Sequence, residues 1–175
     1  LKNVDSRYLL VNVIARRARQ ISIESEITHE PRMDTAEVKR VELHLHTKSS
    51  SMDGFNDPGK IVRLAHRMGH RAVAITDHGV MYGAIDFYRA CKAQGIHPVI
   101  GCEVYVAARS RFNKEHGADS EYSHLILLCK NEEGYKNLCY IVSAAYTEGF
   151  YGKPRIDWEL LREHAGGLIC LSGCV

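Results

Sequence analysis

Short apolar runs alternate with amphipathic stretches over most of the chain. The apolar runs have the length and composition of buried strands at residues 41–46, 71–76, 99–107, 124–129 and 167–171. Between them, apolar positions recur at helical spacing over residues 58–69, 81–94, 132–147 and 157–164. This alternation predicts an α/β domain built on a parallel sheet or barrel, with a charged loop at 108–121.

The amino-terminal part of the chain follows a different pattern. Leu10, Val13 and Ile21 recur at helical spacing, which predicts one amphipathic helix over residues 6–27. Residues 28–39 combine a proline with several charges, as linkers do. We therefore expect this part to be a single helix followed by a linker.

Two parts of unequal size follow from these patterns. Residues 1–39 form the helix and linker, and residues 40–175 form the α/β domain. A full (β/α) barrel typically has about 250 residues, more than the second part offers. We therefore expect a barrel that is incomplete at its carboxyl end in this chain.

Composition narrows the class of protein only modestly. The formal net charge of +2, with 45% hydrophobic and 25% charged residues, is that of a soluble globular protein and argues neither for nor against nucleic-acid binding. No run approaches the ~20 apolar residues that cross a bilayer, so no membrane association is expected. The six cysteines form no CxxC pair, which favours reduced thiols in a cytoplasmic protein over a disulfide framework.

The first apolar run ends in two histidines that share one side of the chain. In a strand, residues two apart face the same way, so His44 and His46 point together and can clamp a metal ion. The polar loop that follows brings in Asp53 as a possible oxygen ligand. Taken alone, a pair of this kind is more often a surface feature than a ligand pair.

Later apolar runs deliver further metal-capable side chains. Asp77 and His78 follow the run at 73–75, although Asp77 could simply cap the next helix and leave His78 exposed. Glu103 lies inside an apolar strand, where a carboxylate needs a cation or hydrogen bonds to offset its desolvation. His124 begins another apolar run, and Cys174 follows the last one. Together these positions predict a metal site, and the nitrogen, oxygen and sulfur ligands suit zinc, manganese or iron rather than calcium.

The remaining histidines and cysteines are not predicted to be ligands. Six histidines lie on helices, in turns or in polar surroundings and are expected at the surface: His29, His66, His70, His97, His116 and His164. Strand alternation turns Cys102 away from Glu103. The other cysteines have the surroundings of core residues: Cys91, Cys129, Cys139 and Cys170.

Five motifs, in this order along the chain, resemble those of the polymerase-and-histidinol-phosphatase (PHP) domain family. They are His44-Leu45-His46-Thr47, Ile75-Thr76-Asp77-His78-Gly79, Gly101-Cys102-Glu103, His124-Leu125-Ile126-Leu127-Leu128 and Ser172-Gly173-Cys174. Residues 131–138 and 147–157 look like the form found at the amino terminus of bacterial DNA polymerase III alpha subunits. The resemblance covers about residues 40–175.

The resemblance implies a (β/α)7 barrel with a polynuclear metal centre. Its ligands in this chain would be His44, His46, Asp53, His78, Glu103, His124 and Cys174, holding two or three divalent ions (Zn, Mn or Fe). Glu103 would bridge the ions, and Asp77 is the candidate catalytic group, expected to orient the ligand imidazoles. The family site also takes an Asp-x-His motif from a later strand, which this chain does not contain.

A second, shorter resemblance lies upstream of the α/β domain. Residues 4–11 and 15–20 look like the first helix of the RNA polymerase omega subunit. It covers only about twenty residues, within 4–21. It implies RNA polymerase core as a possible partner.

Several functions remain open on these patterns. One is the PHP portion of a replicative polymerase, partnered by DNA and other replication subunits, with a site suited to phosphoester hydrolysis such as 3′–5′ exonuclease proofreading or pyrophosphate cleavage. The alternatives are a free histidinol-phosphatase-like phosphoesterase, a non-catalytic interaction module, and an omega-like RNA polymerase assembly protein fused to a PHP segment. Nothing in these residues resembles a polymerase palm, so DNA synthesis itself is not predicted here.

Overall fold

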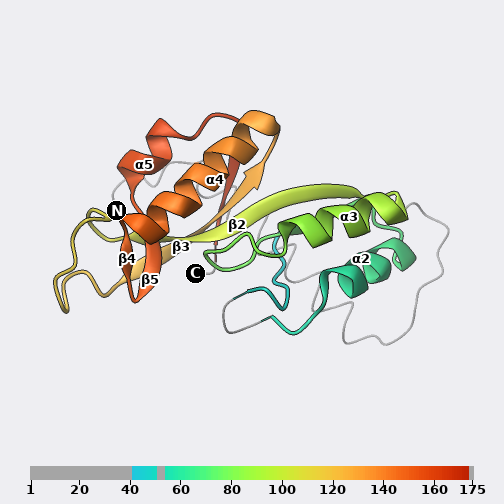
Figure 1. Cartoon of the computed structure of the whole chain (residues 1–175), viewed down its shortest axis with the longest axis horizontal. Helices are drawn as coiled ribbons and strands as arrows, with labels where there is room; N and C mark the ends of the chain where they lie inside the picture. Colours follow the sequence, from blue (N-terminus) through green and yellow to red (C-terminus); the bar gives the residue numbers. More distant parts are fainter. Residues whose placement is uncertain (1–40, 51–53, 174–175) are drawn as a thin grey trace, which may run out of the picture. The chain divides into compact units, whose positions relative to one another are not determined.

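Strand β2 (His97–Ala107) is the longest strand of the computed structural model, which describes residues 41–50 and 54–173 (Figure 1). The helix and linker expected at 1–39 lie outside the described residues. The first half of β2 pairs in parallel with β1 (Ala72–Ile75). Its second half pairs with β3 (Tyr122–Cys129) on one edge and β5 (Lys153–Ile156) on the other.

The sheet is mixed, which corrects the expectation of parallel strands throughout. β3 runs antiparallel to β2, and β6 (Leu168–Ser172) runs antiparallel to β3. A parallel neighbour needs a crossover of a dozen or more residues, usually through a helix. The loop at 108–121 contains no helix and simply reverses the chain, so β3 returns in the opposite direction.

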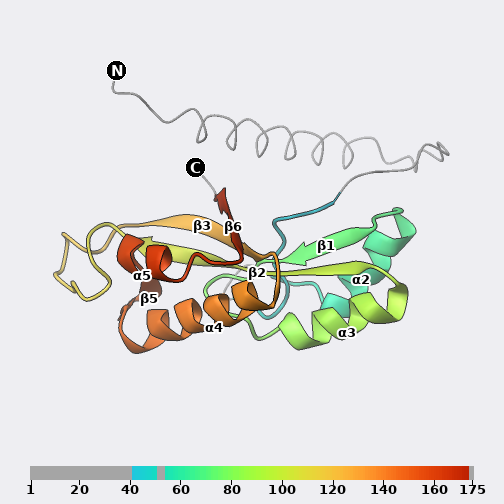
Figure 2. The ribbon, with the colours of Figure 1, turned by 90° about the horizontal axis from the view of Figure 1, so that it is seen from above.

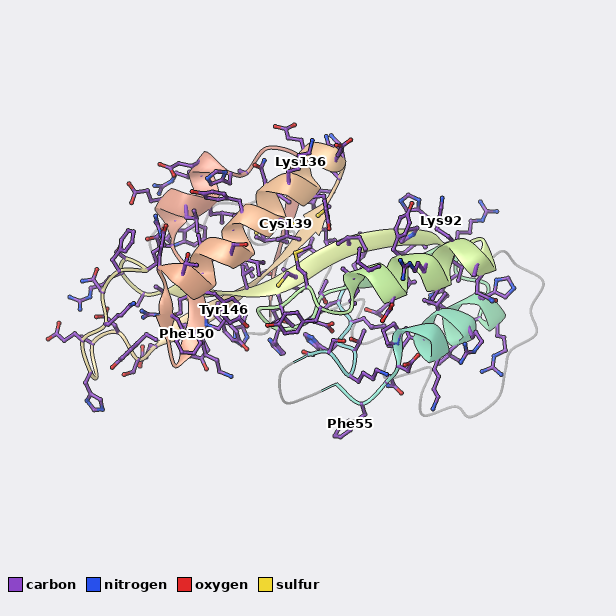
Figure 3. The ribbon with its side chains drawn as sticks, in the orientation of Figure 1. Phe55, Lys92, Lys136, Cys139, Tyr146 and Phe150 are labelled. Carbon is purple, nitrogen blue, oxygen red and sulfur yellow. The ribbon has the colours of Figure 1, made fainter. Side chains whose placement is uncertain are left out.

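A short hairpin joins the sheet where no strand was expected. β4 (Phe150–Tyr151) pairs antiparallel with β5. The hairpin lies near the end of α4 (Glu132–Thr147), where the rings of Tyr146 and Phe150 stack with centroids 6.1 Å apart (Figure 3). These strands are too short to show an alternating pattern, and Pro154 argues against a strand when read in sequence.

The apolar run at 41–46 is not a regular strand, although a strand was expected there. Only Glu42 forms a bridge, with Val73 of β1. Further along, the Leu45 backbone N–H donates to the Thr76 hydroxyl (2.8 Å) instead of a carbonyl, while Thr76 N–H donates to Leu45 O (2.8 Å). The Thr76 side chain thus replaces one backbone acceptor of regular strand pairing, and the segment remains extended beside β1.

The helices begin and end where their capping residues predict. Three N-cap side chains accept a backbone N–H: Asp57 before α2 (Pro58–Arg67), Asn131 before α4, and Asp157 before α5 (Trp158–Glu163). Gly95, at φ 68°, ends α3 (Ala84–Gln94) in the left-handed conformation that glycine adopts without strain. The four predicted helices are therefore present, with boundaries shifted by up to three residues.

The two faces of β2 have different surroundings. Cys102, Val104 and Val106 pack with Leu138 and Ile141 of α4 in the main hydrophobic cluster. Figure 2 shows α3 and α4 lying along β2, α3 beside its first half and α4 beside its second. By strand alternation, Glu103 and Tyr105 face the opposite side from α4. That side carries the polar side chains considered below.

Arg155 fastens the loop at 108–121 to the sheet. Its side chain is fully buried, and its guanidinium donates to three backbone carbonyls at 2.8–3.2 Å: Asn113 O, Asp119 O and Gly149 O. A buried guanidinium is tolerated only where its donors are satisfied. The loop is therefore a fixed part of the domain.

Replacing Arg155 by Met is expected to lower the free energy of unfolding by about 3 kcal/mol, because the buried carbonyls lose their charged donor. Urea denaturation followed by circular dichroism measures this. Arg162→Met, an exposed arginine on α5, is the control and should change stability little. Equal effects of the two substitutions would contradict this role for Arg155.

Candidate metal centre

Four histidines from three separate segments surround the carboxylate of Glu103. His44 and His46 come from the extended segment beside β1, and His78 follows β1 and forms a parallel bridge with Glu103. His124 lies in β3 opposite Tyr105, two positions along the β2–β3 register from Glu103 and so on the same face of the sheet. Backbone bonds fix this junction, since Glu103 N–H donates to Asp77 O (3.2 Å) and Gly79 N–H donates to Glu103 O (2.8 Å).

The two oxygens of Glu103 face different histidine pairs. Oε2 is hydrogen-bonded to His44 Nε2 and lies 3.2 Å from His46 Nε2. Oε1 lies 3.1 Å from His124 Nδ1 and 3.9 Å from His78 Nδ1. Each pair, together with Glu103, offers ligand atoms within 4.8 Å of one another. Glu103 therefore occupies the position of a carboxylate shared by two ligand groups.

The side chain of Glu103 is only 1% exposed. Burial raises the pKa of its carboxyl, but hydrogen bonds from His44 and His46 and the charge of His44 and His78 outweigh burial. The net effect places the pKa well below its usual range. A buried carboxylate lined by imidazoles is suited to cation binding.

His124 supplies an independent indication that the site fits a metal ion. Its Nε2 is buried and has no hydrogen-bond partner among the described residues, while its Nδ1 faces Glu103. Buried polar atoms are normally satisfied, so an imidazole nitrogen left open beside a carboxylate has the character of a ligand. The nitrogen and oxygen donors present fit divalent transition metals.

Asp77 supports the turn that follows His46. Its carboxylate is 1% exposed and accepts from the backbone N–H (2.6 Å) and the hydroxyl (2.8 Å) of Thr47. It does not cap α3, because the N-cap there is Gly83 without a side-chain bond. The reading in which His78 is exposed is also wrong, since its side chain is 14% exposed. The role of Asp77 in orienting the ligand imidazoles stays a prediction. Asp77 could act on His46 through Thr47, the next residue, whose backbone N–H and hydroxyl it binds.

The other histidines and cysteines match the patterns in part: His66, His97 and His116 are exposed and Cys91 is buried, whereas His164, Cys129 and Cys139 are half-buried. Cys102 packs under α4, away from Glu103, as expected. His70 was expected at the surface but is 8% exposed, because the chain reverses at Gly69 (φ 76°) and turns it inward. Cys170 was expected in the core but is exposed on β6. Three predicted residues lie outside the described residues: His29, Asp53 and Cys174.

Ser50 and Tyr105 border the site without any signal in the sequence. The Ser50 hydroxyl accepts from the His78 backbone N–H (3.0 Å) and lies 3.5 Å from His46 Nδ1. Tyr105 is buried and stacks on His78, with ring centroids 5.8 Å apart. Serine in a polar loop and tyrosine in an apolar strand are both ordinary, so only the three-dimensional arrangement reveals their position.

Comparison with known proteins decides the family. A sequence profile of the PHP domain matches residues 42–175. The chain belongs to the PHP domain family. The structure accordingly has an α/β fold, and its ordered motifs are those of this family.

Curated relatives of this PHP chain are DNA polymerase III alpha subunits. The protein from Chlamydia pneumoniae is 52% identical over 136 residues, and that from Treponema pallidum is 51% identical over 141 residues. The subunit from Thermus aquaticus is 47% identical over 144 residues. The matches cover 77–80% of this chain but only 11–12% of each relative. The chain thus resembles one segment of these much longer polymerases.

A second family match and two similarities to solved structures are more limited. A profile of RNA polymerase Rpb6 matches residues 1–45, so the amino-terminal segment does resemble an RNA polymerase subunit. An amidohydrolase from Chromobacterium violaceum, solved with sulfate and no metal, has a TM-score of 0.42 at 23% identity, covering 59% of this chain and 34% of that one. A protein described as a metal-dependent phosphoesterase from Bifidobacterium adolescentis has a TM-score of 0.43 at 21% identity, covering 62% and 35%. Within the described part of the chain, every helix is too short or too polar to cross a bilayer.

Glu103→Gln is expected to weaken divalent metal binding by more than about 100-fold, because it removes the one anionic ligand shared by both histidine pairs. Elemental analysis after dialysis against zinc or manganese measures the bound metal. Glu163→Gln, an exposed glutamate of α5, should bind metal as the unmodified chain does. Unchanged metal content in Glu103→Gln would rule out a bridging role.

Proposed function

We propose that this chain is the PHP portion of a replicative DNA polymerase III alpha subunit and that its metal centre hydrolyses phosphoesters. The proposal is carried by one observation, the buried Glu103 carboxylate shared by two histidine pairs. The polymerase assignment is supported by about 50% identity to alpha subunits over most of the chain. DNA and other replication subunits are the proposed partners, and the cytoplasm is the proposed location.

The proposed ligands divide into two groups around Glu103. His44 and His46 would hold one ion and His78 and His124 a second. Asp53 and Cys174 are the further proposed ligands, and two or three ions are proposed in all. Zinc, manganese or iron are the proposed metals. Bound divalent ions would supply an activated water and offset charge on the phosphoryl oxygens.

The protein's own residues hold this arrangement rigid. The rings of His46 and His78 stack in parallel, with centroids 4.2 Å apart and an interplanar angle of 6°, which fixes one pair relative to the other. Asp77 fixes the turn after His46 through Thr47. Burial raises the pKa of Glu103, but its histidine neighbours lower that pKa below its usual range, which favours the carboxylate form that a cation needs. Rigid ligands of this kind favour positioned hydrolysis.

Hydrolysis by this chain is expected to require metal and both halves of the site. With manganese or zinc, the chain should release nucleotides from the 3′ end of single-stranded DNA or cleave pyrophosphate. His44→Ala and Glu103→Gln are each expected to reduce the rate by about 100-fold or more, since each removes a metal ligand. Chelation should have the same effect. His66→Ala, an exposed histidine of α2, serves as the control.

Three results would separate the alternatives. Hydrolysis that persists in both ligand variants would contradict the proposal. Bound metal that raises the melting temperature without any turnover would favour a non-catalytic module that binds replication subunits. Activity confined to small phosphomonoesters would favour a free histidinol-phosphatase-like enzyme.

The match of residues 1–45 to RNA polymerase Rpb6 supports a second function. We propose that residues 4–21 bind RNA polymerase core. The tagged chain is expected to co-purify with core enzyme, and deletion of residues 1–39 should abolish this while leaving metal binding intact. Equal recovery of core by both forms would contradict the proposal.

A further inference from the structure

A hollow of about 300 Å³ opens beside the metal centre, on the His124 side. Five residues line it: Ser120, Tyr122, Tyr151, Gly152 and Lys153. We call it the aromatic hollow. None of its residues is among the predicted metal ligands, and nothing in the proposed hydrolysis yet uses them.

Ring contacts connect the aromatic hollow to the ligands. Tyr122 stacks on His124, with centroids 5.7 Å apart and an interplanar angle of 28°. Tyr105 meets Tyr122 edge-on at 5.1 Å and His124 at 5.0 Å, and its other neighbour is His78 at 5.8 Å. A group lying on Tyr122 is therefore one ring away from His124, a proposed metal ligand.

The walls of the aromatic hollow are held in place. The Arg155 guanidinium lies 5.0 Å from the centroid of the Tyr151 ring and also donates to Asp119 O, next to Ser120. Gly152 has φ 67°, and nothing lies within 4 Å of where a side chain would project. These contacts fix the walls of the hollow, and the absence of a side chain at Gly152 leaves space there.

The lining combines aromatic faces with one cation. Tyr122 is 39% exposed, so part of its ring is available to a ligand. Lys153 lines the hollow, and its ammonium lies 5.4 Å from the centroid of the Tyr105 ring. Aromatic faces stack on nucleobases, and an ammonium pairs with phosphate. A sugar phosphate would use only the cation, and an apolar peptide only the rings.

We propose that the aromatic hollow binds the terminal nucleotide of a single DNA strand, with its base on Tyr122 and Tyr151 and its phosphate toward Lys153 and His124. The volume is at the lower end of the range for small-ligand sites, enough for one nucleotide and too small for a duplex. The inference rests on the proposed phosphoesterase function and adds the subsite that would hold the strand end beside the metal centre.

Binding of thymidine 5′-monophosphate to the whole chain in EDTA tests the proposal without requiring hydrolysis. Calorimetry is expected to show that this nucleotide binds more tightly than 2-deoxyribose 5-phosphate. Tyr122→Ala should weaken nucleotide binding by about tenfold, because one base–aromatic stack is lost, and should leave the sugar phosphate unaffected. Tyr122→Phe should retain binding, since stacking needs only the ring.

Matched variants keep the test specific. Tyr140→Ala, an exposed tyrosine of α4, should bind as the unmodified chain does. Lys153→Met should weaken binding of nucleotide and sugar phosphate alike, and a thymidylate tetramer should displace the mononucleotide. Equal binding of the two probes, no loss in Tyr122→Ala, or a tetramer that leaves the mononucleotide bound would overturn the proposal. Hydrolysis without nucleotide binding would overturn this inference alone, and binding without hydrolysis the proposed function alone.

Discussion

A buried carboxylate in the middle of the longest strand governs the arrangement of this domain. Burying an ionised Glu103 is costly unless nearby groups stabilise its charge. Four imidazoles surround it, and they arrive from segments on both edges of β2. Meanwhile its neighbours Cys102 and Val104 pack under α4. One strand thus carries the hydrophobic core on one face and the charged centre on the other.

Much of this arrangement could be predicted from local sequence. Helix α4 has the predicted bounds, because Asn131 caps its start and its apolar positions keep helical spacing. The histidines around Glu103 could be named because each lies at or beside one end of an apolar run, and strand ends carry the sites of α/β folds. Glu103, a carboxylate inside such a run, was the clearest signal, because burying its charge is unfavourable unless a cation or hydrogen bonds compensate for the lost hydration.

What could not be predicted depends on contacts distant in sequence. β3 runs antiparallel to β2 because the chain reverses after β2, and a crossover would have made it parallel. The apolar pattern of β3 is the same in both cases and does not distinguish them. The segment before Thr47 fails as a strand because the Thr76 hydroxyl takes the place of a carbonyl. His70 is buried through a reversal at Gly69 that helical spacing does not record. Each depends on a partner that the local pattern does not identify.

The charge balance of the centre bears on what it can bind. Imidazole ligands are neutral when they coordinate, and among the described ligands only Glu103 carries negative charge. One carboxylate cannot neutralise a pair of divalent cations, so a loaded site would keep a positive excess even with the carboxylate of Asp53 and the thiolate of Cys174 as ligands. Such an excess favours anionic ligands, phosphoryl groups among them. Lys153 adds a further positive charge on the His124 side, where the ring of Tyr122 is open to a base. The same electrostatics that would hold metal here would therefore draw a nucleotide toward the site.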